Sequence, residues 1–327
     1  MKKLLGVLLV LTALIFTGCD NNEGPFQVKN ENGEKVLYSG EKPAKGWVQN
    51  EVYNSSGEST KVYEIYFDKG VPAGDFKLYD LKGNLLVDAK GKWQNGLFEG
   101  KIEEPERNAI VTGKFAINPA YLINFSGTEY YDFSAETLID GEYKSDYRTY
   151  SKKNNEYDGE YILYNRDNGQ LLEKCFFQAG ELVGDYISYY SNGTLRKKCT
   201  YKDGKYDGEY EAIITDFYSH YSHEKKNYKN GVLHGKATSY NKKGELTSEM
   251  NYVNGKVSGY IISYSDGWTT KSLYGMVNGY DRLVHEQVYD EKGVLRYEEV
   301  LDKEKKVEIE KRYSSSGKLL YKKTREL

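Results

Sequence analysis

The stretch from residue 177 to residue 208, FQAGELVGDYISYYSNGTLRKKCTYKDGKYDG, contains the same short motif twice. The motif is an aromatic residue, two further residues, glycine, three further residues and a second glycine. It recurs at intervals of 24 to 27 residues within each run, and its aromatic positions are Phe67, Trp93, Phe177, Tyr201, Tyr228 and Tyr252. A repeat of this length indicates tandem copies of one supersecondary unit.

A second motif lies about half a period away from the first. It consists of tyrosine, three residues and glycine, usually followed by x-Leu, and it begins at Tyr53, Tyr79, Tyr189, Tyr240, Tyr289 and Tyr313. Each unit therefore has two glycine-marked turns, and two turns imply two strands. The pairs that supply the positive φ required by tight hairpin turns include Asn192-Gly193, Asn230-Gly231 and Asn254-Gly255.

The residues between the turns alternate with a period of two. After Gly193, one face of the expected strand carries Leu195, Lys197, Cys199 and Tyr201. The residues between these positions are all polar. Such alternation is typical of antiparallel strands that expose one face to solvent. Helical periodicity is absent after residue 19, so the sequence predicts an all-β fold.

These turns resemble those of bacterial MORN-repeat variants. The resemblance is strong over residues 177–259, recognisable over 53–100 and 289–319, and poor over 101–155. It implies an elongated, single-layer antiparallel sheet of tandem β-hairpins with about 24 residues per unit. Some members with this repeat variant are YwqK-type antitoxins, so the resemblance also implies a possible partner class.

The rhythm of the motifs divides the chain into five segments. They are a leader at 1–18, a lipidated cysteine with a polar tether at 19–35, divergent repeats at 36–100, irregular repeats or an insertion at 101–155, and regular repeats at 156–327. Pro105 and Pro119 interrupt the rhythm of the fourth segment, because proline cannot donate a hydrogen bond to a sheet.

The first residues have the pattern of an export signal. Lys2 and Lys3 precede a short, uncharged and mostly apolar run that ends at Phe16. The small residues before Cys19 resemble a bacterial lipobox, in which the cysteine thiol receives a diacylglyceryl group and its new amino group receives an acyl chain such as palmitate. We therefore expect a lipoprotein of the bacterial cell envelope, tethered to the inner or the outer membrane. The alternative is an ordinary signal peptide with an incidental cysteine.

The composition excludes two classes of protein. The hydrophobic fraction of 39% is too low for a polytopic membrane protein. A net charge of -3, with acidic and basic residues interspersed, argues against a nucleic-acid-binding protein.

Tyrosine is strongly enriched, with 33 tyrosines against 11 phenylalanines. In a single-layer sheet the apolar face lacks a second layer, and tyrosine suits it because its ring is apolar and its tip is polar. The rings are expected to lie across glycines of neighbouring strands. Most tyrosines would then serve to hold the repeats together. As a set they form a candidate binding face, made of Tyr189, Tyr201, Tyr228, Tyr240, Tyr252 and Tyr264.

Cys175 and Cys199 occupy the same position in adjacent repeats. Equivalent positions lie two strands apart, about 9.5 Å, which exceeds the reach of a disulfide. We predict two free thiols, and the alternative is a disulfide that joins two repeats in an oxidising compartment.

Residues with catalytic or metal-binding potential are few. The only group of metal-ligand type is Asp216, His220, His223 and Glu224, which we interpret as an exposed polar loop. His234 and His285 are isolated in the sequence, and no nucleophile, phosphate-binding or metalloprotease motif is present. The sequence predicts a protein that is not an enzyme and needs no cofactor or metal.

The leading hypothesis is a non-enzymatic envelope lipoprotein whose repeats bind another protein or envelope component. The contact would use the tyrosine-rich face or a sheet edge, and self-association through that face is included. The alternative is an antitoxin or immunity protein that neutralises a secreted toxin. Polysaccharide recognition ranks third, because the chain has only three tryptophans.

Overall fold

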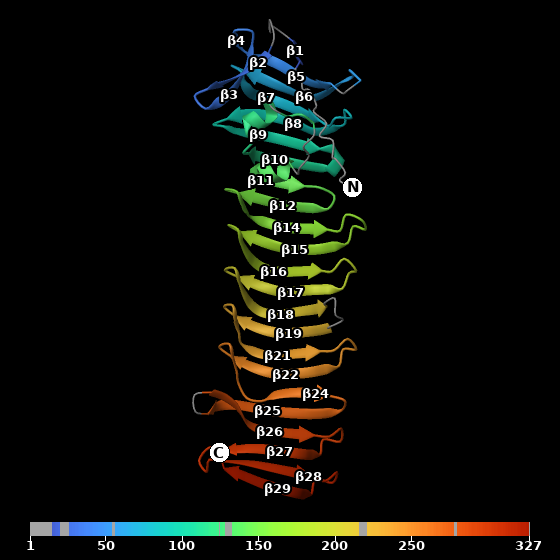
Figure 1. Cartoon of the computed structure of the whole chain (residues 1–327), viewed down its shortest axis with the longest axis vertical. Coiled ribbons are helices and arrows are strands. Elements are labelled where there is room, and N and C mark those ends of the chain that lie inside the picture. Colours follow the sequence, from blue (N-terminus) through green and yellow to red (C-terminus); the bar gives the residue numbers. More distant parts are fainter. Residues whose placement is uncertain are drawn as a thin grey trace, which may run out of the picture. The chain divides into compact units, whose positions relative to one another are not determined.

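The computed structural model describes residues 26–53, 56–123, 125–127, 133–215, 221–277 and 280–326, together with the backbone of Ile15–Cys19. The chain is 69% strand and 5% helix, and its strands pair antiparallel as hairpins, which confirms the predicted all-β hairpin fold. It divides into two compact units, and Figure 1 labels most of their strands. The N-terminal unit comprises Met1–Gly169 and Phe177–Gly180, and the C-terminal unit comprises Gln170–Phe176 and Glu181–Leu327. Strand β15 (Leu171–Gln178) contributes residues to both.

The N-terminal unit is built on a sheet whose strands follow one another in chain order. These strands are β1 (Ile15–Cys19), β5 (Gly46–Tyr53), β6 (Ser59–Asp68), β7 (Val71–Tyr79), β8 (Leu85–Gln94), β9 (Leu97–Glu104), β10 (Ala109–Phe115), β11 (Leu138–Lys144), β12 (Arg148–Lys153), β13 (Glu156–Tyr157) and β14 (Gly159–Tyr164). A separate three-stranded sheet contains β2 (Phe26–Glu31), β3 (Glu34–Ser39) and β4 (Lys42–Pro43). A single 3-10 turn, η1 (Pro105–Arg107), joins β9 to β10.

Two short helices cover part of the N-terminal unit, and the sequence did not predict them. They are α1 (Pro119–Ile123) and α2 (Phe133–Thr137); α1 contacts β3, and α2 packs against β10 and β11. The ring of Phe133 lies 6.0 Å from that of Phe76 on β7, and both side chains are buried. The poorly matching segment is therefore hairpin strands with a helical cover, and this unit has a closed hydrophobic core.

A buried carboxylate anchors the cover. Glu104, at the end of β9, is 1% exposed and accepts a hydrogen bond of 2.6 Å from the backbone N–H of Ser134 in α2. The guanidinium of Arg107 lies 3.4 Å from the same carboxylate. A charged acceptor at the start of α2 satisfies a backbone donor that the helix itself cannot pair.

Four glycines lie in register across β8 to β11. Gly100 pairs with both Gly91 and Gly113, and Gly113 pairs with Gly141. A Cβ atom at Gly113 would lie 1.9 Å from the carbonyl oxygen of Asp140. The close approach of these backbones is possible only without side chains.

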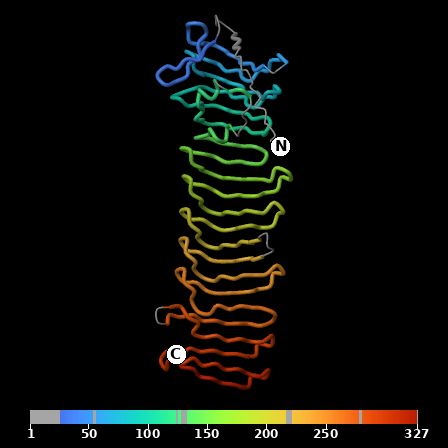
Figure 2. The backbone as a smooth tube through the Cα atoms, in the orientation of Figure 1, coloured from blue at the N-terminus to red at the C-terminus, as the bar shows by residue number. Residues whose placement is uncertain are grey.

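The C-terminal unit is a succession of hairpins in chain order (Figure 2). Besides its part of β15, it contains β16 (Glu181–Tyr189), β17 (Leu195–Lys202), β18 (Lys205–Thr215), β19 (Tyr221–Lys229), β20 (Val232–Leu233), β21 (Gly235–Tyr240), β22 (Leu246–Val253), β23 (Lys256–Val257), β24 (Ile261–Ser265), β25 (Trp268–Val277), β26 (Tyr280–Tyr289), β27 (Leu295–Asp302), β28 (Val307–Tyr313) and β29 (Leu319–Glu326). Among its described residues the unit is a single layer, as the resemblance implied.

The turns explain both motifs. In the first motif, the residue before the first glycine also has positive φ: Asn230 has 51° and Gly231 has 80°. Asn254-Gly255 has the same geometry, so these two pairs are confirmed as turns with two positive φ angles.

The turn at Asn192-Gly193 also supplies a positive φ, but its geometry differs from that of the other two pairs. There the positive φ of 84° belongs to Gly193 alone, and Asn192 accepts a hydrogen bond from the backbone of Thr194. This is the turn of the second motif, and in several of its copies the residue after the tyrosine accepts two backbone N–H groups. Asp80 and Asp290 do so with one carboxylate oxygen each.

Among the described glycines, the expected packing of rings on glycines is found in the N-terminal unit and not in the C-terminal unit. In the N-terminal unit a Cβ atom at Gly74 would lie 3.3 Å from the ring of Tyr66. In the C-terminal unit a Cβ atom at Gly184 or Gly208 would meet nothing within 4 Å. Those two glycines have φ of 69° and 104°, so the backbone angle is the reason for glycine there.

Within the described part of the chain, both helices are too short to cross a bilayer.

Candidate functional site

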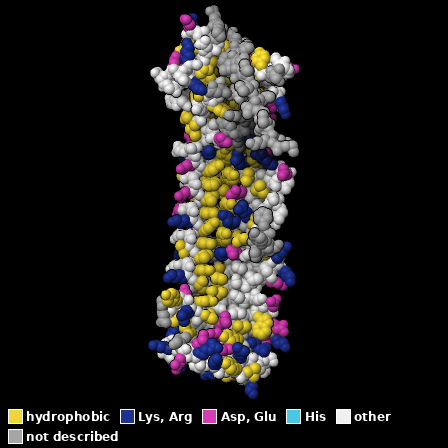
Figure 3. Space-filling view, in the orientation of Figure 1, with side chains coloured by type: hydrophobic (Ala, Val, Ile, Leu, Met, Phe, Trp, Pro, Cys, Tyr) yellow, Lys and Arg dark blue, Asp and Glu magenta, His cyan; other side chains and the backbone are white. Residues whose placement is uncertain are grey.

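A cluster of tyrosine rings covers one face of β16 to β19 in the C-terminal unit. We call it the tyrosine face, and it consists of Tyr186, Tyr201, Tyr206, Tyr210 and Tyr228. The register creates it, because Tyr201 pairs with Tyr206 across β17 and β18, and directly paired residues share a face. Figure 3 shows hydrophobic side chains gathered in a band over the strands of this region.

The rings of the tyrosine face contact one another. The centroid of Tyr206 lies 4.9 Å from that of Tyr201, and Tyr206 is 5.1 Å from Tyr228. Tyr210 is 5.6 Å from Tyr228 with an edge-to-face geometry. All five side chains are half-buried. Aromatic contacts of this kind stabilise the sheet by about 1 kcal/mol each beyond area burial, so these tyrosines do hold the repeats together.

One lysine is enclosed by the rings. The Nζ atom of Lys197 lies 4.2 Å from the ring centroid of Tyr186 and 3.3 Å from the hydroxyl of Tyr201. An ammonium group over aromatic rings is attracted by their negative faces. The tyrosine face therefore presents rings, hydroxyls and the ammonium group of Lys197, together with the ion pair of Lys226 and Glu224.

Burial keeps the phenols protonated. Desolvation, followed by the charges of neighbouring tyrosines, raises the pKa of Tyr210 to about 12. Desolvation also raises the pKa of Tyr186, Tyr201 and Tyr228. The hydroxyls are thus neutral hydrogen-bonding groups at physiological pH.

The six tyrosines of the predicted binding face do not lie on one face. Tyr201 and Tyr228 belong to the tyrosine face, and Tyr252 lies on the same side as Met250, whose sulfur its hydroxyl contacts at 3.2 Å. Met250 pairs with Ala237 there.

The other three tyrosines lie on the opposite face. Tyr240 pairs with His223, and the hydroxyl of Tyr264 donates to Glu249 at 2.9 Å. Tyr189 is an odd number of residues from Tyr186 along β16, so it too lies on the opposite face. The two sequence motifs place their tyrosines on different faces, because Tyr189 follows Gly184, the second glycine of the first motif, by an odd number of residues along β16.

Sequence reasoning missed Tyr186, Tyr206 and Tyr210. A signal was present, because Tyr186 and Tyr210 each follow the second glycine of the first motif by two residues. A period of two puts such residues on the face that this glycine occupies.

The thiol of Cys199 lies on the same sheet face as the rings, because Cys199 pairs with Tyr186 and with Tyr210. Cys175 and Cys199 are buried and free, which confirms the prediction of two unpaired cysteines. Burial, with the charge of Glu173, raises the pKa of Cys175 to about 12, and burial also raises that of Cys199. Protonated thiols are poor nucleophiles, so these cysteines fill space in the sheet.

The prediction of an exposed polar loop is wrong for two of its four residues, because His223 and Glu224 lie in β19 and are half-buried. Asp216 and His220 lie outside the described residues. His223 pairs with Ile213 and Glu224 with Ala212, so the two adjacent side chains point to opposite faces of β19. His223 contacts Glu211 at 2.7 Å. The four residues therefore cannot all converge on one ion, and no metal-binding group is found among the described residues.

His285 is not isolated, contrary to its appearance in the sequence. Its Nδ1 atom lies 2.6 Å from the hydroxyl of Tyr260, and its Nε2 atom lies 3.1 Å from Glu298. Glu298 also accepts hydrogen bonds from Gln287 and from Lys311, the latter at 2.7 Å. This network joins side chains across neighbouring strands, and Lys311 neutralises the carboxylate.

Cys19, the predicted lipidation site, is described by its backbone only. It ends β1 and pairs with Trp47 of β5. The rest of the predicted leader and the first part of the tether, residues 1–14 and 20–25, lie outside the described residues.

The fold defines this chain as a β-hairpin repeat protein. Residues 182–203 and 233–254 match the family model described as MORN repeat variant, so the chain carries MORN repeat variants in its C-terminal unit. The resemblance inferred from the sequence is confirmed there.

Comparisons with whole proteins add little. The search of curated proteins found no match. Among solved structures, the crystal structure of TcdB2-TccC3 is similar at 11% identity over 93% of this chain and 19% of that chain, with a TM-score of 0.14. This chain therefore spans about a fifth of that one, and the likeness carries no argument about function.

Proposed function

We propose that this chain is a non-enzymatic repeat protein of the bacterial cell envelope, anchored by lipid on Cys19, and that its tyrosine face binds another protein. One observation carries the proposal: five half-buried tyrosines form a cluster that nothing covers among the described residues of the C-terminal unit. The corresponding core of the N-terminal unit lies under two helices.

The chemistry of the tyrosine face favours a protein partner. Tyrosine is enriched at the centres of protein interfaces, because a large rigid ring is buried at little entropic cost while the hydroxyl keeps a hydrogen bond. Lys197 is held in place by the rings and would add a fixed donor. An acidic or hydroxyl-bearing side chain of the partner would complement it.

The test is affinity capture with paired variants. The tagged full-length chain is incubated with envelope and secreted fractions of its host, and bound proteins are identified by mass spectrometry. Tyr201→Thr with Tyr228→Thr alters the tyrosine face, whereas Tyr240→Thr with Tyr264→Thr makes the matched change on the opposite face. We expect one stoichiometric protein to be lost with the first pair and kept with the second.

The capture also separates the alternatives. Loss of the partner only with the second pair would overturn the choice of face. A basic secreted toxin as the partner would favour the immunity function, which the acidic charge of the chain suits. An empty capture, with a chain that is monomeric and binds no surface-hydrophobicity dye, would overturn the proposal.

The anchor has its own test. Cys19→Ser removes the acceptor thiol, so we expect the chain to move from the membrane fraction to the aqueous fraction and to lose labelling by an alkyne-bearing palmitate analogue. Cys175→Ser is the control, because its thiol is buried and it should leave both readouts unchanged. Membrane retention of the Cys19→Ser chain would contradict the anchor.

A further inference from the structure

A groove crosses β5 to β8 of the N-terminal unit on the side away from the core. It has a volume of about 480 Å³. Its lining is Trp47, Val48, Gln49, Glu64, Asp75, Lys77, Asp88 and Lys90. Except for the buried Val48, these side chains alternate with buried residues such as Ile65 and Phe76, so they belong to the outer face of the sheet.

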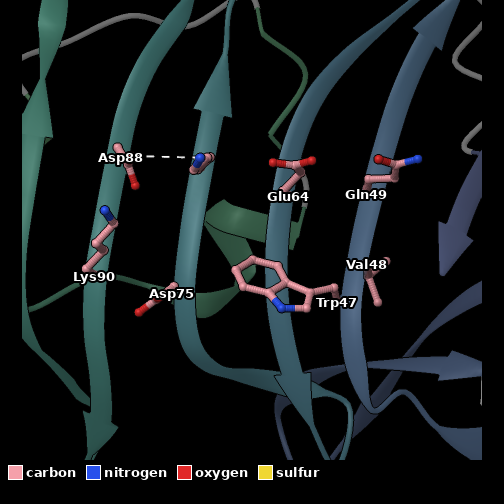
Figure 4. Close-up of a pocket in the computed structure, with 8 residues that line it drawn as sticks. Trp47, Val48, Gln49, Glu64, Asp75, Asp88 and Lys90 are labelled. Atoms are coloured by element: carbon pink, nitrogen blue, oxygen red, sulfur yellow. Dashed lines mark ion pairs between the residues drawn. The ribbon is translucent and has the colours of Figure 1, made fainter. Parts of the chain in front are cut away.

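An exposed indole forms one side of this groove. Trp47 is 43% exposed, which is high for the largest apolar side chain. Its ring meets that of Tyr66 edge-on, with centroids 5.8 Å apart and planes at 78°. In Figure 4 the indole extends from β5 across β6 toward Asp75. A flat aromatic surface is thus held open beside polar groups.

The path of β7 creates the recess beside the indole. The register of β6 and β7 shifts between Ile65 and Phe67, where Phe67 pairs with Pro72. Asp75, in the displaced segment, accepts a hydrogen bond of 2.8 Å from the backbone N–H of Gly91 on β8. One oxygen of Asp75 is therefore fixed, and the carboxylate is positioned by the sheet itself.

The polar groups of the groove are preorganised. Glu64 accepts hydrogen bonds of 2.7 Å from Lys61 and 3.0 Å from the hydroxyl of Tyr79. Although partial burial opposes it, these bonds lower the pKa of Glu64, so the carboxylate is ionised. Lys77 lies 3.9 Å from Asp88 (Figure 4).

The lining contains both signs of charge. The lining has three carboxylates and the ammonium groups of Lys77 and Lys90. The Gln49 amide adds both a donor and an acceptor. An anionic ligand would meet the carboxylates, and a cationic ligand would meet the lysines. A neutral ligand with many hydroxyl groups can use donors and acceptors together, and its C–H face can pack on an indole.

We propose that this groove binds a neutral saccharide, with Trp47 as the stacking surface and with Gln49 and Asp75 as hydrogen-bonding groups. The site lies in a different unit from the tyrosine face and does not depend on the proposed function.

The experiment titrates the full-length chain with three neutral hexasaccharides, built from β-1,4-linked glucose, β-1,4-linked N-acetylglucosamine and α-1,4-linked glucose. Binding is measured by calorimetry and by tryptophan fluorescence. We expect at least one of them to bind saturably, and Trp47→Ala to weaken that binding by at least about tenfold. Gln49→Ala and Asp75→Asn should weaken it by about threefold to tenfold, and Asp75→Asn keeps the acceptor for Gly91.

Trp268→Ala is the matched control. Trp268 is also 43% exposed but lies on β25 of the C-terminal unit, so its loss should change the affinity by less than about twofold. Absence of binding by all three hexasaccharides would overturn the proposal, as would unchanged affinity of a folded Trp47→Ala chain. Equal loss in Trp47→Ala and Trp268→Ala would also overturn it, because it would indicate non-specific stacking. Preferential binding of hexalysine would identify a cation site instead.

Discussion

Both units have a sheet with an apolar face, and they differ in how that face is shielded from water. In the N-terminal unit the face carries phenylalanine and aliphatic residues such as Phe76 and Ile102, which are fully buried under α1, α2 and the small sheet. In the C-terminal unit the tyrosine face of β16 to β19 carries rings such as those of Tyr206 and Tyr210, which are half-buried. A covered face can be made of hydrocarbon, whereas an uncovered face needs rings with a polar tip.

The comparison also separates structural from binding roles. The residues of the closed core contribute to stability only, because they are buried and cannot contact a partner. The tyrosines of the open face contribute to stability through ring contacts and still present their hydroxyls. A partner surface is therefore expected in the C-terminal unit. Mutations in the N-terminal unit should mainly reduce stability, whereas mutations of the open face should have smaller effects on stability and should also change the exposed surface.

The largest difference between the units in loss of stability should come from substitutions of glycine. Gly113→Ala places a Cβ atom 1.9 Å from a backbone oxygen, and we expect a loss of about 4 kcal/mol in the N-terminal unit. Gly184→Ala meets no atom within 4 Å, so only its φ of 69° opposes alanine, at about 1 kcal/mol. Urea unfolding followed by fluorescence measures each unit, in one background that keeps only Trp93 and in another that keeps only Trp268 of the three tryptophans. Equal losses would show that the aligned glycines are not a close-packed line.

The next difference should come from the aromatic residues. Phe76 is fully buried and its ring lies 5.2 Å from that of Phe98, so Phe76→Ala should destabilise its unit by about 4 kcal/mol. Tyr210→Ala removes a half-exposed ring, and about 2 kcal/mol is expected. The same unfolding curves supply the values. A larger effect at Tyr210 would contradict the description of the C-terminal face as open.

The strongest pH effect of a single carboxylate is expected in the C-terminal unit, at Glu298. Burial opposes ionisation of Glu298, but hydrogen bonds from Lys311, His285 and Gln287 outweigh it and lower its pKa to about 2. Because the folded-state pKa lies below the ordinary value of 4.5, the stabilisation is present above that value and is lost as pH falls toward 2. We expect the urea concentration at the unfolding midpoint, reported by Trp268, to decrease as the pH is lowered from 5 to 2.5.

Glu298→Gln is the control for this effect. Glutamine cannot ionise, so the variant should be less stable at pH 5 and should show a flatter pH profile over the same range. A profile as steep as that of the unaltered chain would assign the effect to other carboxylates.

The smallest effect should come from removing one hydroxyl. Tyr228→Phe keeps the ring contacts with Tyr206 and Tyr210, so stability should change by less than about 0.5 kcal/mol. The exposed surface becomes more apolar, and binding of a hydrophobic dye should rise. A large loss of stability would mean that the hydroxyl is structural and would weaken the distinction between the units.

Sequence reasoning identified the repeat because its physical basis is local. A positive φ at Gly231 or Gly255 is a property of the turn, and alternation along a strand is a property of the extended backbone. The free thiols followed from the same reasoning, since strand spacing separates equivalent positions of adjacent repeats. These features need no knowledge of distant contacts.

Other features depend on register, which the motifs did not reveal. The gathering of Tyr201 and Tyr206 on one face depends on their pairing across β17 and β18. The groove beside Trp47 arises from a shift in register between β6 and β7. His285 acquired its partners because the register brings Glu298 and Tyr260 to its strand.

The sequence by itself determined that this chain is a tandem array of antiparallel hairpins, because turn angles and alternation are encoded within a few residues of one another. Only the tertiary structure decided which sheet face is covered, how Glu104 anchors the cover, and which tyrosines gather into one face. Those outcomes depend on pairing between segments that are distant in the chain. A shift of one residue in such pairing moves a side chain to the other face.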